Sequence, residues 1–93
     1  MNQITEADVQ RCTNNRLEAQ RLRKEIKKDL LGIKWRHVYT EPRINGVYRM
    51  KFWMMNDYDL GRLNEFLDTK YPGLQKQNIV GMWGYKSVAV FIK

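Results

Sequence analysis

The sequence predicts an α+β fold, in which a long N-terminal helix and a shorter central helix pack on a four-stranded, mainly antiparallel sheet. Apolar residues recur at helical spacing in the first third of the chain and again after position 57. Two other stretches have the residue patterns of β-strands, one with alternating apolar and polar residues and one with a continuous apolar run. Each contains a turn signal. The predicted order is helix, two strands, helix, two strands, in a single domain of 93 residues.

The first helix is expected over about 5–31. Thr5 is a favoured N-cap residue, and Gly32 suits the end of a helix. Asn15 and Arg16 interrupt the apolar stripe, so the N-terminal half is expected to be held less firmly. The stripe itself consists of Val9, Cys12, Ala19, Leu22, Ile26 and Leu30.

The length of this helix raises two alternatives. At 1.5 Å per residue it would be about 39 Å long, whereas a compact domain of this size is only about 30 Å across. The first turns are therefore expected either to fray or to pack on another molecule. Asn15 and Asp29 would both occupy seam positions of a coiled coil, which weakens heptad support. A homo-oligomer through the N-terminal helix stays one of the two expectations.

The first hairpin is expected over about 33–55, because Asn45-Gly46 is a strong signal for a two-residue turn. Such a turn places Val38 opposite Trp53. One face of the hairpin is then core-like and reads Ile33, Trp35, His37, Tyr39, Tyr48, Met50, Phe52 and Met54. The other face is cationic with apolar residues among the charges, and reads Lys34, Arg36, Val38, Thr40, Arg49, Lys51, Trp53 and Met55.

The second helix is expected over about 57–71. Asn56 or Asp57 can cap it, and Tyr71-Pro72-Gly73 ends it. Its buried stripe is expected to be Leu60, Leu63, Leu67 and Tyr71.

The second hairpin is expected over about 76–92, with its turn near Trp83-Gly84. Residues 88–92 are apolar on both faces, as expected of an interior strand. This pattern predicts that both faces of the sheet are at least partly covered. It leaves open whether the two helices share one face.

The composition favours a polyanionic partner. Seventeen lysine and arginine residues against ten acidic residues give a formal charge of +7, which suits nucleic acid, an acidic membrane surface or an acidic protein. A single cysteine excludes an intramolecular disulfide, and the N-terminus lacks the pattern of a secretory signal, so the predicted location is cytoplasmic. The apolar runs are too short to cross a bilayer, so no membrane partner is predicted.

Residues that carry reaction chemistry are few. His37 is the single histidine and alternates with core-like residues, and Cys12 is expected to be a small apolar helix residue. Asp57 and Asp59 are explained by the start of a helix. The sequence has no glycine motif of the P-loop or dinucleotide type. The prediction is therefore a protein that is not an enzyme and holds no metal or cofactor.

The leading functional hypothesis is a non-enzymatic nucleic-acid-binding protein that uses the cationic face of the first hairpin. The expected contacts to phosphates and bases are Lys34, Arg36, Arg49, Lys51 and the stacking residue Trp53. Three helix cations that have no acid three or four residues away would extend this track: Arg16, Arg23 and Lys27. The alternative is a solvated outer face in which a helix covers Trp53.

A rival hypothesis is a small protein-binding inhibitor or adaptor, for example of viral or mobile-element origin. It would dock on a larger host or defence protein. The small size, the lack of reaction chemistry in the sequence and the long helix fit this hypothesis. The basic surface would then meet an acidic patch on the partner.

Overall fold

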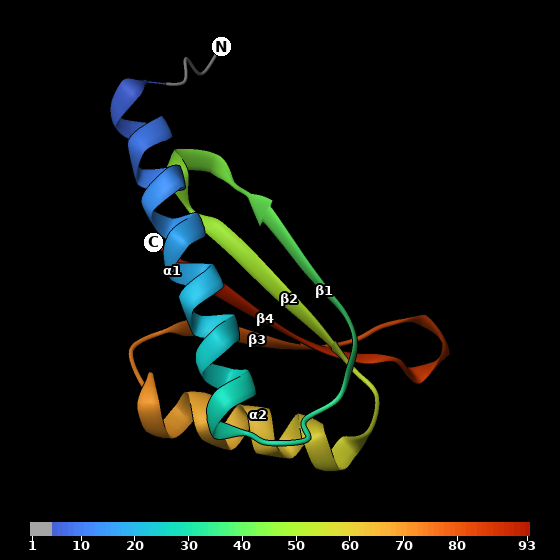
Figure 1. Ribbon diagram of the computed structural model, residues 1–93. Helices are drawn as coiled ribbons and strands as arrows, with labels where there is room; N and C mark the ends of the chain where they lie inside the picture. Colours follow the sequence, from blue (N-terminus) through green and yellow to red (C-terminus); the bar gives the residue numbers. More distant parts are fainter. Residues whose placement is uncertain (1–4) are drawn as a thin grey trace.

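The computed structural model describes residues 5–93 and confirms the α+β fold (Figure 1). The elements are α1 (Glu6–Asp29), β1 (Trp35–Pro42), β2 (Tyr48–Met54), α2 (Asp57–Lys70), β3 (Gln75–Val80) and β4 (Lys86–Ile92). Two short 3-10 turns form the hairpin tips, η1 (Ile44–Gly46) and η2 (Met82–Gly84). The strand order is β1-β2-β4-β3 and all pairs are antiparallel. Figure 1 shows the C-terminal end of α1 close to α2.

Both helices begin at the capping residues that the sequence indicates. The Thr5 hydroxyl accepts a hydrogen bond from the Asp8 N–H at 3.1 Å. The Asn56 side chain accepts one from the Asp59 N–H at 2.7 Å. Each bond satisfies a backbone donor that has no partner inside its helix. Gly32, with φ 76°, follows the end of α1 in the left-handed region that glycine adopts at low cost.

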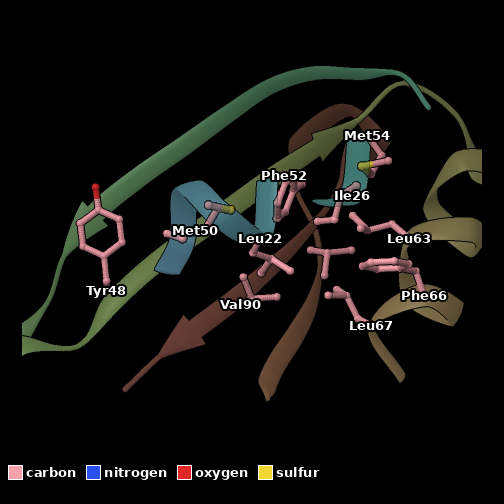
Figure 2. Close-up of a cluster of buried hydrophobic side chains, with 12 residues drawn as sticks. Leu22, Ile26, Tyr48, Met50, Phe52, Met54, Leu63, Phe66, Leu67 and Val90 are labelled. Atoms are coloured by element: carbon pink, nitrogen blue, oxygen red, sulfur yellow. The ribbon is translucent and has the colours of Figure 1, made fainter. Parts of the chain in front are cut away.

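One hydrophobic core lies between the sheet and both helices (Figure 2). Alternate residues of β2 point into it, and they meet buried residues of β4, α1 and α2. The buried members are Ala19, Leu22, Ile26, Tyr48, Met50, Phe52, Met54, Leu63, Phe66, Leu67, Val88 and Val90. Because the same side of β2 contacts both helices, α1 and α2 share one face of the sheet.

Neither helix covers the opposite face of the sheet, and we call it the open face. The apolar pattern of β4 predicted that both faces are at least partly covered, and β4 is buried on both faces although neither helix lies over the open one. Ser87 and Ala89 lie on the open face and are nevertheless buried. Ser87 lies between Trp53 and Ile79 in the strand register, and both of these neighbours have much longer side chains. Burial of a short side chain in a central strand thus needs no covering helix.

The first hairpin has a three-residue loop in place of the predicted two-residue turn. The Arg43 N–H donates to the Val47 carbonyl at 2.6 Å, and Asn45 and Gly46 adopt left-handed conformations. The extra loop residue shifts the pairing of the strands by one position. Because side chains alternate with a period of two, this shift exchanges the faces of β1.

The observed register places Val38 opposite Phe52 and His37 opposite Trp53. His37 and Tyr39, which were predicted for the core-like face, therefore lie on the open face. The cationic-face positions predicted for Val38 and Thr40 were likewise wrong, and both residues lie on the helix side. A β-bulge between Trp35 and His37 then restores Trp35 to the helix side, where it pairs with Met54.

The N-terminal half of α1 packs on the tip of the first hairpin. Asn15 is only 7% exposed, and its Nδ2 donates to the Gly46 carbonyl at 2.8 Å. Arg11 donates to the Asn45 carbonyl at 3.0 Å. Gly46 is buried with φ 76°, and a Cβ there would lie 2.9 Å from the Arg11 Cβ. Asn15 and Arg16 do interrupt the buried apolar stripe as predicted, and the amide of Asn15 instead anchors the hairpin tip. A homo-oligomer through α1 stays a prediction.

Replacing Asn15 by alanine is expected to lower the free energy of unfolding by about 1–3 kcal/mol. The substitution leaves the buried Gly46 carbonyl without a donor, and an unsatisfied buried group costs about this amount. Asn14→Ala is the matched control, because Asn14 is exposed and, among residues 5–93, its side chain bonds only the Gln10 side chain on the same helix. Urea denaturation of the two variants measures the difference. Equal midpoints would contradict the anchoring role of Asn15.

Asp59 joins the start of β1 to α2. Its carboxylate accepts hydrogen bonds from the Lys34 N–H at 3.2 Å, from Asn56 Nδ2 at 3.1 Å and from Arg62 Nη1 at 3.1 Å. Burial disfavours the charged form, but these bonds and the charge of Arg62 prevail and hold the pKa of Asp59 below its ordinary value. The contacts of Asp59 are therefore those of a structural residue at a helix start.

Candidate nucleic-acid interface

The strand register defines the residues of the open face. They come from all four strands and are polar, aromatic or cationic for the most part. They are His37, Tyr39, Glu41, Arg49, Lys51, Trp53, Gln75, Gln77, Ile79, Ser87, Ala89 and Phe91. The β2 residues Arg49, Lys51 and Trp53 lie on one face, as the alternation of the strand predicted.

Four rings form a continuous row across the open face, which we call the aromatic row: His37, Tyr39, Trp53 and Tyr85. The ring centroids of His37 and Tyr39 are 4.2 Å apart, and those of Tyr39 and Trp53 are 6.0 Å apart. Trp53 and Tyr85 follow at 6.1 Å. Trp53 is half-buried by its neighbours, whereas Tyr39 and Tyr85 are exposed. The row therefore offers aromatic surfaces to a ligand from β1, from β2 and from the residue that precedes β4.

Two cations lie against this row. Lys51 Nζ is 5.4 Å from the centre of the Trp53 ring, and the Arg36 guanidinium carbon is 4.9 Å from the centre of the Tyr85 ring. Arg36 is the extra residue of the β-bulge, and a bulge of this kind redirects a side chain. Within residues 5–93, neither cation is in a salt bridge. Both charges are thus available to an anionic ligand.

Arg49 is on the same face, but its charge is compensated. Glu41 lies directly opposite Arg49 in the register and forms a salt bridge with it. Glu41 also contacts Arg43 at 3.3 Å. The predicted two-residue turn assigned no acid to the cationic face, and the one-residue shift brings Glu41 onto it. Arg49 is therefore a weaker candidate for a phosphate contact than Arg36 or Lys51.

The remaining predicted contacts lie away from the aromatic row. Lys34 precedes β1, and its N–H is bound to Asp59. Arg23 and Lys27 of α1 lie over the Trp35 ring, at 5.8 and 5.6 Å from its centre. Because Trp35 packs against the core on the helix side of the sheet, these two cations are on the opposite side from Arg36 and Lys51.

Arg16 is exposed on α1, seven positions before Arg23. An α-helix rises about 1.5 Å per residue, so seven positions separate the two by roughly 10 Å along the axis. Like Arg23 and Lys27, it belongs to the element on the helix side of the sheet. The structure thus separates Arg16, Arg23 and Lys27 on α1 from Arg36 and Lys51 at the aromatic row.

A hollow of about 220 Å³ lies beside the aromatic row at the second hairpin tip. Its lining includes Lys51, Trp53, Ile79, Met82, Trp83 and Tyr85. Sequence reasoning missed His37, Tyr39, Met82, Trp83 and Tyr85 as candidate site residues. The signal for the last three was a turn carrying large apolar residues, which is an unusual place for them.

The arrangement suits binding better than reaction chemistry. Flat rings stack nucleobases, and cations beside them contact phosphates. Among the residues that the structure describes, no three His, Cys, Asp or Glu side chains gather as metal ligands. That the protein is not an enzyme stays a prediction from its sequence.

A comparison with protein-family models, with curated protein sequences and with solved structures gives no match. In the range 5–93, none of the helices has the length and apolar character needed to cross a membrane.

Proposed function

We propose that this protein binds nucleic acid through the open face of its sheet, without catalysing a reaction. The observation that carries the proposal is the aromatic row with Arg36 and Lys51 against it, on the side that neither helix covers. Stacking of a base on an aromatic side chain contributes about 1–3 kcal/mol. A net charge of +7 adds long-range attraction for a polyanion.

The aromatic row and its cations support this proposal over a merely solvated surface. A solvated strand face needs only scattered charges, whereas here four rings are in contact with one another across neighbouring strands. Arg36 and Lys51 lie over rings and lack acidic partners among residues 5–93. Bases and phosphates are the ligand groups that match both features at once.

The binding constant is expected to fall with rising salt concentration, with a small slope of log K against log salt. Each phosphate contact contributes about −0.7 to the slope of log K against log salt for single strands, so two contacts predict a slope of about −1.4. Fluorescence anisotropy of a labelled oligonucleotide, titrated at several salt concentrations, measures this slope. A salt-independent affinity, or no binding at low salt, would contradict the proposal.

A protein with an acidic surface is a second candidate partner, favoured by the exposed apolar residues of the second hairpin. Val80, Met82 and Trp83 are 70%, 79% and 88% exposed, and contiguous exposed apolar residues mark protein-interaction surfaces. The protein would then act as a small inhibitor or adaptor, for example of viral or mobile-element origin. A pull-down from nuclease-treated lysate separates the candidates. A stoichiometric protein that survives nuclease treatment favours this candidate, and loss of every partner favours nucleic acid.

A further inference from the structure

The two hairpin tips have the same backbone conformation but different surroundings. In each tip, one backbone hydrogen bond closes a three-residue loop. The Arg43 N–H donates to the Val47 carbonyl at 2.6 Å, and the Gly81 N–H donates to the Tyr85 carbonyl at 2.7 Å. The last two loop residues of each tip are left-handed. Their φ values are 62° for Asn45, 76° for Gly46, 66° for Trp83 and 75° for Gly84. The tips therefore differ in the side chain that occupies the first left-handed position.

That side chain is favourable in the first tip and unfavourable in the second. Asparagine is among the few residues other than glycine that adopt a left-handed conformation readily, whereas a bulky indole is strained there. The first tip is also held by Asn15 and Arg11 of α1. Trp83, in contrast, is 88% exposed and forms no part of the core. Folding therefore gains little from the indole, and strain of this kind concentrates at functional sites.

Trp83 forms part of the wall of the hollow at the end of the aromatic row. Trp53 and Tyr85 also line the hollow, and Lys51 is the cationic residue in its lining. The hollow of about 220 Å³ is smaller than the roughly 300–1,000 Å³ of common small-molecule sites. Its size and its aromatic lining suit one planar ring system.

We propose that this hollow holds one unpaired nucleobase, which is stacked on the aromatic row and closed off by Trp83, with the adjacent phosphate at Lys51. This inference rests on the proposed function and specifies its ligand as single-stranded nucleic acid. In a duplex each base is paired and stacked, so a base must be extruded before it can enter the hollow. Duplex would bind only through its phosphates.

Trp83→Asn tests this inference, because asparagine occupies the equivalent position of the first tip. Removal of one stacking partner is expected to weaken binding of a labelled single strand of about 12 nucleotides by about 5- to 150-fold. The weaker binding of the same sequence as a duplex is expected to be unchanged. Relief of backbone strain is expected to raise Tm by about 4 °C or more. Fluorescence anisotropy and thermal unfolding of the full chain measure the three effects.

Two further variants serve as controls. Trp83→Phe keeps a stacking ring and is expected to retain most of the single-strand affinity. Ile44→Ala truncates an exposed residue of the first tip, equivalent in the loop to Met82, and is expected to leave affinity unchanged.

The outcomes separate this inference from the proposed function. If Trp83→Asn binds the single strand as the unaltered protein does, while Trp53→Ala binds it weakly, the proposed base site is wrong. The proposed binding of nucleic acid through the open face is then retained. Equal losses for single strand and duplex also overturn the base site. A fall in Tm would show that Trp83 supports the fold instead. If Trp83→Asn abolishes a dimer in size-exclusion chromatography and leaves oligonucleotide affinity intact, the tip is a self-association surface.

Discussion

The double variant Arg36→Glu/Lys51→Glu is expected to lose more than about 100-fold in affinity for a single-stranded oligonucleotide at low salt. Each substitution removes an attractive charge and adds a repulsive one beside the aromatic row, and misplaced like charges cost several kcal/mol. A loss of about 2.8 kcal/mol already corresponds to about 100-fold. Fluorescence anisotropy gives the affinity, and circular dichroism checks that the fold is unchanged.

A matched control separates the location of the charges from the net charge. Lys24→Glu/Lys28→Glu makes the same change in charge at two exposed positions of α1, on the helix side of the sheet. It is expected to weaken binding far less, because screening limits its reach to about 10 Å at 0.1 M salt. Equal losses from the two pairs would show that general charge attraction, and not the open face, determines binding.

Arg49 is unsuitable for the same experiment, although the sequence places it beside Lys51. Glu41 lies opposite Arg49 across the strand pair and forms a salt bridge with it. Arg49→Glu would replace this salt bridge with two facing carboxylates. Like charges directly opposite each other destabilise a strand pair. A loss of binding in that variant would therefore combine an effect on the site with an effect on the fold.

Replacing Phe52 by alanine is expected to lower the free energy of unfolding by about 3–5 kcal/mol. The Phe52 side chain is fully buried, its ring lies 5.4 Å from the Trp35 ring, and it belongs to the core between the sheet and both helices. Truncation leaves a cavity at the centre of the molecule. This loss is a large share of the roughly 5–15 kcal/mol that holds a typical domain folded. The shift of the urea midpoint measures it.

Trp53→Ala is the matched variant on the neighbouring residue, whose side chain points to the other face. Its effect on unfolding is expected to be smaller than that of Phe52→Ala, because the indole is only half-buried and lies outside the core. Its effect on nucleic-acid affinity is expected to be large, because two other rings and Lys51 lie against it. Destabilisation as large as that of Phe52→Ala would contradict the placement of Trp53 on an open face.

Local chemistry made the helices and their ends predictable. Thr5 and Asn56 carry the short polar side chains that satisfy backbone donors at a helix start, and the structure uses both in this way. The alternation of β2 likewise predicted its two faces, because a strand has a fixed period of two. Each of these features depends on residues close together in the chain.

The register of the first hairpin was not predictable in the same manner. Asn45-Gly46 fits both a two-residue and a three-residue loop. The choice between them decides whether His37 and Tyr39 face the core or the ligand, and whether Glu41 neutralises Arg49. Contact of the tip with Asn15 and Arg11, more than 30 positions earlier, accompanies the observed loop.

The candidate site depends on pairing between distant segments. Trp53 and Tyr85 meet because β2 pairs with β4, and Trp83 joins them because the second tip lies at that end of the sheet. The amino-acid sequence was sufficient for the α+β class, the helix caps and the basic character, since composition and short-range patterns encode these. The shared face of the helices, the aromatic row and the hollow arise from long-range packing, because burial of one continuous core selects among registers that local patterns leave equivalent.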